Sequence, residues 1–299
     1  MWRCTRGPWT WKRFCAKVPD RWATWLAERR FGGSDDARSE SQAMFDEFRT
    51  RVLAGAGIRP GDTVLDVGCG EGLIGLGALG LVGEDGAVVF SDVSEDVLDV
   101  CREIAGGDPR CEFVRASADE LPLEDESVDA VTTRSTLIYL EDKPRALREF
   151  FRVLRRGGRL SMFEPVNSFG WPEPEGVFGG YDVETIWHVA QKLRGCFGAE
   201  TLVGWDERDF LSWVEGAGFR DVEITLELEV KPYPMAQIRD WETYRNFAPN
   251  PLAPTLQEAM DQRLTPEEQA RFVAHIRPLV EAGEGSHRMA SAYVRAVKT

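Results

Sequence analysis

The sequence lacks any run of about 18 apolar residues, so it predicts no membrane-spanning helix. It also lacks an excess of basic residues: 36 Lys and Arg stand against 50 Asp and Glu, for a formal net charge of −14 over 299 residues. Nucleic-acid-binding proteins carry a basic surface that displaces counterions from phosphates, so this balance argues against such a partner. No apolar signal-peptide core follows the basic start, and we expect a cytoplasmic protein.

Cysteine and histidine are few and widely spaced. There are three histidines and no CxxC pair, the cysteines being Cys4, Cys15, Cys69, Cys101, Cys111 and Cys196. Zinc sites and disulfide frameworks need closely spaced ligands or a regular set of half-cystines. We therefore expect neither a metal site nor a disulfide framework.

Apolar residues make up 43% of the chain, which is ample for the core of one large or two modest domains. The first 30 residues differ from the rest, because eight of them are Lys or Arg, two are acidic and five are Trp. Such a leader fits an anionic surface or partner, or else a helix that packs its rings on the main body. We expect the second.

Short apolar, β-branched runs alternate with helical patterns along most of the chain. The predicted strands are 63–67, 87–91, 111–115, 128–133, 158–164, 219–230 and 290–297. The predicted helices are 41–58, 72–82, 94–105, 143–154, 206–217, 254–263 and 265–281. This alternation predicts βαβ units around a parallel sheet, and therefore an α/β fold.

Two irregular stretches, 166–205 and 231–288, interrupt the alternation and are rich in Pro, Gly or large aromatic residues. Open α/β sheets bind ligands beyond the carboxyl ends of their strands, so we interpret both stretches as lid insertions over that edge. The predicted organisation is an N-terminal helical segment (1–58), a core (59–165), a lid insertion (166–205), a core continuation (206–230), a second helical insertion (231–288) and a final core strand (289–299).

The sharpest local signal is VLDVGCGEG at residues 64–72, where a predicted strand ends on Asp66, passes through alternate glycines and opens a helix. Asp92 ends the next strand, and its carboxylate suits a ribose diol. This pattern also fits a dinucleotide-binding loop, with Asp92 serving NAD. Asp66, however, would repel a pyrophosphate and attract an ammonium group, while Asp119 offers an acceptor for an adenine amine. The three acids favour S-adenosylmethionine over NAD.

From about residue 60 to 166 the chain resembles the class I S-adenosylmethionine-dependent methyltransferases, close to the ubiquinone/menaquinone-biosynthesis type and its small-molecule relatives. The resemblance rests on VLDVGCGEG at 64–72, FSDVS at 90–94 and the segment 116–165, which includes the VLRRGG turn before the fifth strand. It implies a Rossmann-like sheet of seven strands with helices on both faces. It also implies S-adenosylmethionine as the methyl donor, released as S-adenosylhomocysteine.

The resemblance also assigns residues to the cofactor. They are Asp66, Gly68, Cys69, Gly70 and Gly72 in the first loop, then Asp92, Val93, Ala118, Asp119, Arg134 and Ser135. It places Asp92 at the ribose hydroxyls, Val93 under the adenine and Asp119 at the adenine amine. Arg134 stands where many relatives have Asn or His. We expect it at the methionine moiety, and a plain salt bridge is the alternative.

The acceptor side is less defined by sequence. The candidates for a catalytic group are Tyr139 and His188, and the predicted acceptor contacts are Tyr139, Glu164, Asn167, Trp171 and Tyr181. An aromatic lid interrupted by prolines suits a hydrophobic or aromatic acceptor, although ordinary loop packing explains the same aromatic residues. A general base is needed only when the nucleophile is a poorly acidic hydroxyl or a carbon acid.

The resulting hypothesis is a methyltransferase of secondary metabolism that transfers the methyl group in line to a small hydrophobic or aromatic acceptor in a closed pocket. One alternative keeps the cofactor but catalyses decarboxylation, hydroxylation or cyclisation, and another is a peptide or protein methyltransferase. Arsenic methylation, which relatives perform, needs converging thiols, and only Cys196 lies in a predicted lid. An acidic surface with two lids is compatible with a homodimer.

Overall fold

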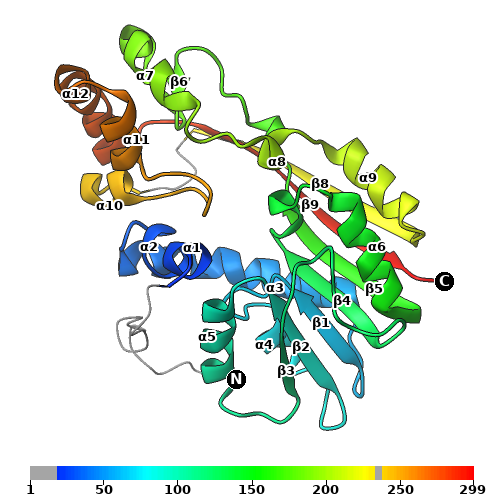
Figure 1. Ribbon diagram of the computed structural model, residues 1–299. Coiled ribbons are helices and arrows are strands. Elements are labelled where there is room, and N and C mark those ends of the chain that lie inside the picture. The colour runs from blue at the N-terminus through cyan, green and yellow to red at the C-terminus, as the bar shows by residue number, and fades with distance from the viewer. Residues whose placement is uncertain (1–18, 233–237) are drawn as a thin grey trace.

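The centre of the structure is a seven-stranded sheet with the order β3-β2-β1-β4-β5-β9-β8 (Figure 1). The computed structural model describes residues 19–232 and 238–299, so the leader residues Trp2, Trp9 and Trp11 lie outside the described residues. The strands are β1 (Thr63–Val67), β2 (Ala87–Asp92), β3 (Cys111–Arg115), β4 (Val128–Arg134), β5 (Leu154–Pro165), β8 (Arg220–Lys231) and β9 (His287–Val297). The predicted sheet of seven strands is confirmed.

The strand order reverses between β1 and β4, which is where an open α/β sheet forms its ligand site. The first five strands pair in parallel, whereas β9 runs antiparallel to both β5 and β8. Parallel strands end at the same edge of a sheet. The carboxyl ends of β1, β2 and β4 therefore bring Val67, Asp92 and Arg134 to one edge.

Helices cover both faces of the sheet. One face carries α3 (Gln42–Ala56), α4 (Gly75–Ala78) and α5 (Glu95–Ala105), and the other carries α6 (Lys143–Val153) and α9 (Glu207–Gly216). Because strand side chains alternate between the two faces, Val64 packs in the core on the α3 side of the sheet and Leu65 in the core on the α6 side. The predicted helix 72–82 is wrong in extent, since only α4 is α-helical there. Its repeated glycines each cost about 1 kcal/mol of helix stability relative to alanine.

The two predicted lid insertions form one helical cap with a common core. Its elements are the hairpin β6 (Val177–Phe178) and β7 (Tyr181–Asp182) and the helices α7 (Trp187–Arg194), α10 (Trp241–Asn246), α11 (Leu256–Arg263) and α12 (Pro266–Ala282). Phe178 and Tyr181 of the first insertion share a buried cluster with Tyr244 and Phe272 of the second. The cap lies at the end of the long strands β8 and β9, and α8 (Glu200–Val203) follows α7 on the way back to the core (Figure 1).

The N-terminal segment contacts both the core and the cap. It consists of α1 (Arg21–Thr24), a π-helical turn (Trp25–Arg29) and α2 (Asp35–Glu40). Ala23 and Leu26 pack against Val97 of α5. On the other side, Trp25 Nε1 donates a hydrogen bond to the Ala248 carbonyl at 2.9 Å, in the loop after α10. The segment thus lies across the space between α5 and the cap (Figure 1).

Among residues 19–232 and 238–299, none of the helices combines the length and the hydropathy that crossing a membrane requires.

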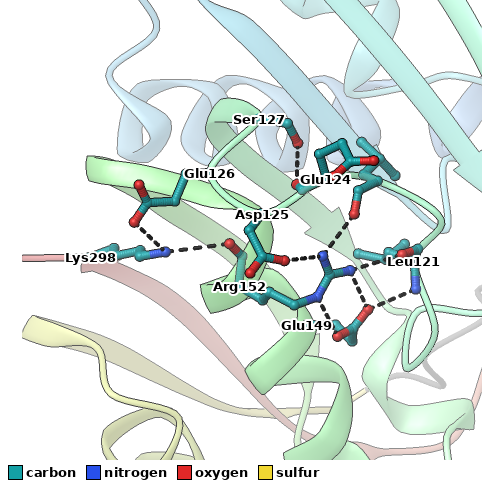
Figure 2. A network of polar contacts seen from close by, with 9 residues as sticks. Leu121, Glu124, Asp125, Glu126, Ser127, Glu149, Arg152 and Lys298 are labelled. Carbon is teal, nitrogen blue, oxygen red and sulfur yellow. Dashed lines mark hydrogen bonds and ion pairs between the residues drawn. The ribbon is translucent and has the colours of Figure 1, made fainter.

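Arg152 of α6 fixes the loop between β3 and β4 (Figure 2). Its guanidinium donates to the carboxylates of Glu149 and Asp125, each at 2.8 Å, and to two loop carbonyls at 2.7 and 2.9 Å. Lys298 donates to the Arg152 carbonyl at 3.4 Å and pairs with Glu126 at 3.4 Å. These bonds, led by the one to Glu149, raise the pKa of Arg152. The network ties the loop that follows the carboxyl edge of β3 to the body of the protein.

We expect Arg152→Met to lower the free energy of unfolding by about 1–2 kcal/mol, because two loop carbonyls and two carboxylates lose a charged donor. Urea denaturation followed by circular dichroism measures the change. Arg148→Met on the same helix is the control, since Arg148 is exposed and lies 3.9 Å from Asp142. Equal effects of the two substitutions would show that the network adds nothing to stability.

Candidate active site at the carboxyl edge of the sheet

The loop after β1 turns on glycines in the left-handed region. Gly68 has φ 63°, and a Cβ there would overlap Thr136 Oγ1, so no larger residue fits at this position. Gly70 has φ 54°, but a Cβ there would meet no atom within 4 Å. The loop is thus tightly packed at Gly68 and presents bare backbone to open space at Gly70. Bare backbone of this kind lets a ligand approach closely.

Asp66 lies beneath this loop. Its Oδ2 accepts from the Gly75 amide at 2.8 Å and its Oδ1 from Thr132 Oγ1 at 3.1 Å, and the residue is 1% exposed. Burial raises the pKa of its carboxyl to about 7. Each carboxylate oxygen of Asp66 thus accepts a hydrogen bond from the protein and supports the loop from below, while the contact of Asp66 with a ligand ammonium stays a prediction.

Asp92 joins the glycine loop to the end of β2. Its Oδ2 accepts from the Gly70 amide at 3.1 Å and its Oδ1 from the Ser94 amide at 3.0 Å. Burial raises its pKa. Unlike Asp66, it is only half-buried, and Val93 beside it is 39% exposed. A partly accessible carboxylate and an apolar side chain therefore meet at the open side of Gly70.

The segment after β3 lies against the same place. The Ala116 amide donates to the Asp92 carbonyl at 3.0 Å, which brings residues 116–119 next to the end of β2. Ala118 is buried, and the half-buried Asp119 carboxylate accepts from the Ser117 hydroxyl. The structure thus brings together the residues predicted to surround an adenine ring.

Cys69 packs under the loop with Cys101 of α5. The two sulfur atoms are 4.0 Å apart, and Cys101 Sγ donates to the Gly70 carbonyl at 2.9 Å. Burial raises the pKa of the Cys69 thiol well above its usual value, which disfavours the thiolate. Cys69 therefore has the surroundings of a small packing residue and not those of a nucleophile.

The end of β4 carries a strained turn. Ser135 has φ 53°, a left-handed conformation that is uncommon for serine, and its amide donates to the Phe163 carbonyl at 2.8 Å. Thr136 Oγ1 donates to the Val67 carbonyl at 3.2 Å, which holds this turn against the glycine loop. The turn thereby fixes Arg134 beside the loop.

Glu164 holds the same turn from β5. Its carboxylate accepts from the amides of Thr136, Leu137 and Ile138 at 2.8, 2.9 and 3.3 Å, and the residue has no exposed surface. These three backbone donors let Glu164 position the turn, and its predicted acceptor contact stays a prediction. Burial raises the pKa of its carboxyl to about 7.

This raised pKa sets the sign of a pH effect. A carboxyl that binds its proton more tightly in the folded state than in the unfolded chain stabilises the fold at low pH, and this stabilisation is lost as the pH rises through 7. Glu164→Gln removes the titration. From pH 5 to pH 8 we expect wild type to lose about 2 kcal/mol of unfolding free energy relative to the variant. Urea denaturation at both values tests this, with Glu103→Gln on exposed α5 surface as the control, and a constant difference would contradict it.

An arginine–aromatic cluster lies beside the strained turn. Its members are Arg30, Arg134, Tyr139, Trp22, Trp25, Phe31, Phe45 and Phe48. Tyr139 packs edge-on against Trp22 at 5.1 Å between ring centroids, and burial raises its pKa to about 12. Sequence reasoning missed Arg30 and the Phe residues of α3, because their only local signal is ordinary helical periodicity.

Three predicted acceptor-side residues lie in or against the cap. His188 is exposed on α7 and lies 3.1 Å from Arg271 of α12. Tyr181 is fully buried in the cap core, with its ring 5.6 Å from that of Tyr244. Trp171 lies 5.9 Å from the Arg194 guanidinium. The acceptor contacts predicted for Tyr181 and Trp171, and the catalytic role predicted for His188, stay predictions.

Two further features complete the acceptor side. Asn167 lies in the turn directly after β5, and its acceptor contact stays a prediction. A hollow of about 630 Å³ on the cap, between α11 and α12, contains none of the predicted site residues. This hollow therefore shares no residue with the site predicted at the sheet edge.

Comparisons with known proteins identify relatives of this chain. Residues 65–162 match a family model described as a methyltransferase domain. The chain is 32% identical over 209 residues to the demethylmenaquinone methyltransferase of Clavibacter sepedonicus, covering 60% of this chain and 82% of that protein. It is 33% identical over 181 residues to the ubiquinone/menaquinone biosynthesis C-methyltransferase of Escherichia coli O1:K1, covering 56% and 70%.

Among solved structures, the YcgJ protein of Bacillus subtilis shares the fold with a TM-score of 0.54 at 16% identity, covering 85% of this chain and 98% of that one. The two sequence relatives are each more than 30% identical and are covered over more than two thirds of their length. The chain therefore belongs to the class I S-adenosylmethionine-dependent methyltransferases of the ubiquinone/menaquinone-biosynthesis type, and it is an enzyme that uses S-adenosylmethionine and releases S-adenosylhomocysteine.

Proposed function

We propose that this methyltransferase acts on a small aromatic acceptor held between the glycine loop and the arginine–aromatic cluster. One observation carries the proposal: the end of β4 and the turn that follows it contact both. Thr136 Oγ1 bonds the Val67 carbonyl at 3.2 Å on the loop side, while the Arg134 guanidinium lies 5.5 Å from the Phe45 ring on the cluster side. A methyl donor on the loop and a ring in the cluster would meet at this turn.

The residues at the loop fit S-adenosylmethionine. Bare backbone at Gly70 leaves room for the ligand, and the Asp92 carboxylate beside it suits the ribose hydroxyls. Val93 and Ala118 offer apolar surface for the adenine, and Asp119 an acceptor for its amine. Arg134 and Ser135 are the groups we assign to the methionine side. When bound, the cofactor supplies a methyl group that its sulfonium already activates.

The protein's own task is then to orient the acceptor and exclude water. The rings of the cluster offer faces against which an aromatic acceptor stacks. Trp25 and Arg29 of the N-terminal segment hold the cap loop at Ala248, through hydrogen bonds of 2.9 and 3.0 Å. This closure supports a water-poor site, in which electrostatic interactions are stronger. Tyr139, with its pKa raised to about 12, stays protonated at neutral pH and is a hydrogen-bond donor.

Two measurements test the proposal. Isothermal titration with S-adenosylmethionine, S-adenosylhomocysteine and NAD checks the cofactor, and we expect binding of the first two and none of NAD. A panel of phenols, naphthols and quinols is then incubated with S-adenosylmethionine, and S-adenosylhomocysteine and methylated products are quantified. Product formation without methylation would support the decarboxylation, hydroxylation or cyclisation alternative. Methylation of peptides but of no aromatic compound would contradict the acceptor class.

A further inference from the structure

Strand β8 lies at one margin of the sheet (Figure 1). It pairs with β9 on one side, and within residues 19–232 and 238–299 no strand pairs with its other side. This open edge belongs to a strand of 12 residues. Proteins usually protect such an edge with a short strand, a proline, inward-pointing charges or a covering segment, because an open edge pairs readily with a further strand.

The half of β8 that approaches the cap exposes apolar side chains at alternate positions. Leu226, Leu228 and Val230 are 37, 57 and 66% exposed. They lie on the same face of the strand as Ile224, which packs against the main core, so the apolar face continues beyond its buried part. A hollow of about 260 Å³ adjoins Leu226 and Leu228, with Ala290 of β9 in its wall. Contiguous apolar surface of this kind marks a contact with another molecule.

The opposite face of the same strand carries balanced charges. Three glutamates there each pair with a cation: Glu223 with Arg295, Glu227 with Arg51 and Glu229 with Lys231. The chain as a whole has a net charge of −14, so two copies repel each other over most of their surface. At the edge of β8 this repulsion is small. A basic partner, by contrast, finds these carboxylates already neutralised, and the charge distribution therefore favours a second copy of the chain.

We propose that the free edge of β8 binds the same edge of a second copy, so that the two β8 strands pair antiparallel and the two sheets become continuous. A twofold axis brings identical segments together in opposite directions, which is the geometry of an antiparallel pair. Leu228 lies on this axis, opposite Leu228 of the second copy. Leu226 then lies opposite Val230 of the second copy, beside the hollow.

Two features select this register. It alone sets all three exposed apolar side chains of one copy opposite those of the other. It also places Lys231 opposite Thr225 of the second copy, where its diagonal neighbours are Glu223 and Glu227. Long side chains reach diagonal neighbours, so each Lys231 gains acidic partners across the interface. Glu227 faces Glu229 of the second copy, and the ion pairs within each copy offset this contact.

The interface leaves the cofactor site open. The glycine loop follows β1, and β4, β5 and β9 separate β1 from β8. Calorimetric binding of S-adenosylhomocysteine therefore reports whether each interface variant is folded, independently of its dimerisation. Failure of wild type to bind S-adenosylhomocysteine would contradict the proposed cofactor site and not the interface.

Sedimentation equilibrium of the full chain measures the dimer. We expect wild type to have the mass of two chains at micromolar concentration. Leu228→Lys should raise the dissociation constant of the dimer at least tenfold, because it places two ammonium groups on the axis and removes an apolar pair. Leu81→Lys is the matched control and should dimerise like wild type, since Leu81 is also exposed but follows α4, which packs against β1 and β2.

A cysteine on the axis tests the register. Side chains directly opposite each other in an antiparallel pair have Cβ atoms about 4.5–5.5 Å apart, so a small adjustment allows a disulfide. We expect Leu228→Cys to form a covalent dimer with oxidised glutathione, which is reduced to two glutathione thiols as the two cysteines join. Leu81→Cys and wild type, which retains the native cysteines, should stay uncross-linked.

The inference is overturned if wild type is a monomer at high micromolar concentration. A dimer that Leu228→Lys does not weaken would place the interface elsewhere, and a dimer that it weakens, but that Leu228→Cys does not cross-link, would reject the axis at Leu228. Monomeric wild type that binds phosphatidylcholine vesicles through Leu228 would assign the apolar face to a lipid surface. If Leu228→Lys does not fold, Val230→Lys, at a more exposed position, takes its place.

Discussion

Asp92→Ala is expected to raise the dissociation constant for S-adenosylmethionine by about 10- to 150-fold, or about 1.5–3 kcal/mol. Two losses add up. The substitution removes the carboxylate that we assign to the ribose hydroxyls, and it also removes the acceptor of the Gly70 and Ser94 amides, at 3.1 and 3.0 Å. The Gly70 amide of the glycine loop then no longer bonds to a side chain at the end of β2.

Isothermal titration calorimetry with S-adenosylmethionine and S-adenosylhomocysteine measures this effect. Asp99→Ala, on the exposed surface of α5 beside Arg102, is the control and should bind both ligands like wild type. Asp92→Asn keeps one acceptor oxygen without the charge, and we expect it to fall between wild type and alanine. If Asp92→Ala binds S-adenosylmethionine as tightly as wild type, the assignment of Asp92 to the ribose hydroxyls is wrong.

Phe272→Ala is expected to lower the free energy of unfolding by about 3–5 kcal/mol. Phe272 of α12 is fully buried in the cap, and its ring packs edge-on against Phe178 of the first insertion at 5.5 Å between centroids. Truncation leaves a cavity at the place where the two insertions meet. Because they share this core, we expect both to loosen together.

Urea denaturation followed by tryptophan fluorescence and circular dichroism tests this expectation. Phe169→Ala is the matched control, since Phe169 is 41% exposed and should cost less than about 1 kcal/mol. A separate early transition in Phe272→Ala, with S-adenosylhomocysteine binding retained, would show that the cap unfolds ahead of the sheet. A loss as small as that of the control would mean that the insertions do not depend on a common core.

Most of the fold was predictable because its signals are local. The period-2 and period-3.6 patterns located β1, α5, α6 and both long antiparallel strands to within a few residues. The misjudged helix at 72–82 contains four glycines, whose low helix propensity outweighs the apolar periodicity around them. Glycine and aspartate positions at the ends of β1 and β2 likewise indicated the loop, since left-handed turns and strand ends depend on residue type.

The acceptor side was not predictable in the same way. Glu164 and Tyr181 are residue types that serve equally well as ligands or as buried structural groups, and sequence spacing does not say which way a side chain points. Three backbone amides turn Glu164 inward, and the shared cap core encloses Tyr181. Arg30 carried no signal, because its neighbour Arg134 lies more than a hundred residues further along the chain.

The sequence alone determined the seven-stranded α/β fold, the glycine loop and the acids at its side, because each depends on short-range periodicity or on the backbone freedom of glycine. The tertiary structure alone decided that two insertions share one core, and that Arg30 of the N-terminal segment and Arg134 of β4 lie against the same Phe45 ring. Those features come from long-range packing. In such packing, burial and the available hydrogen-bond donors determine the role of side chains that look equivalent in the sequence.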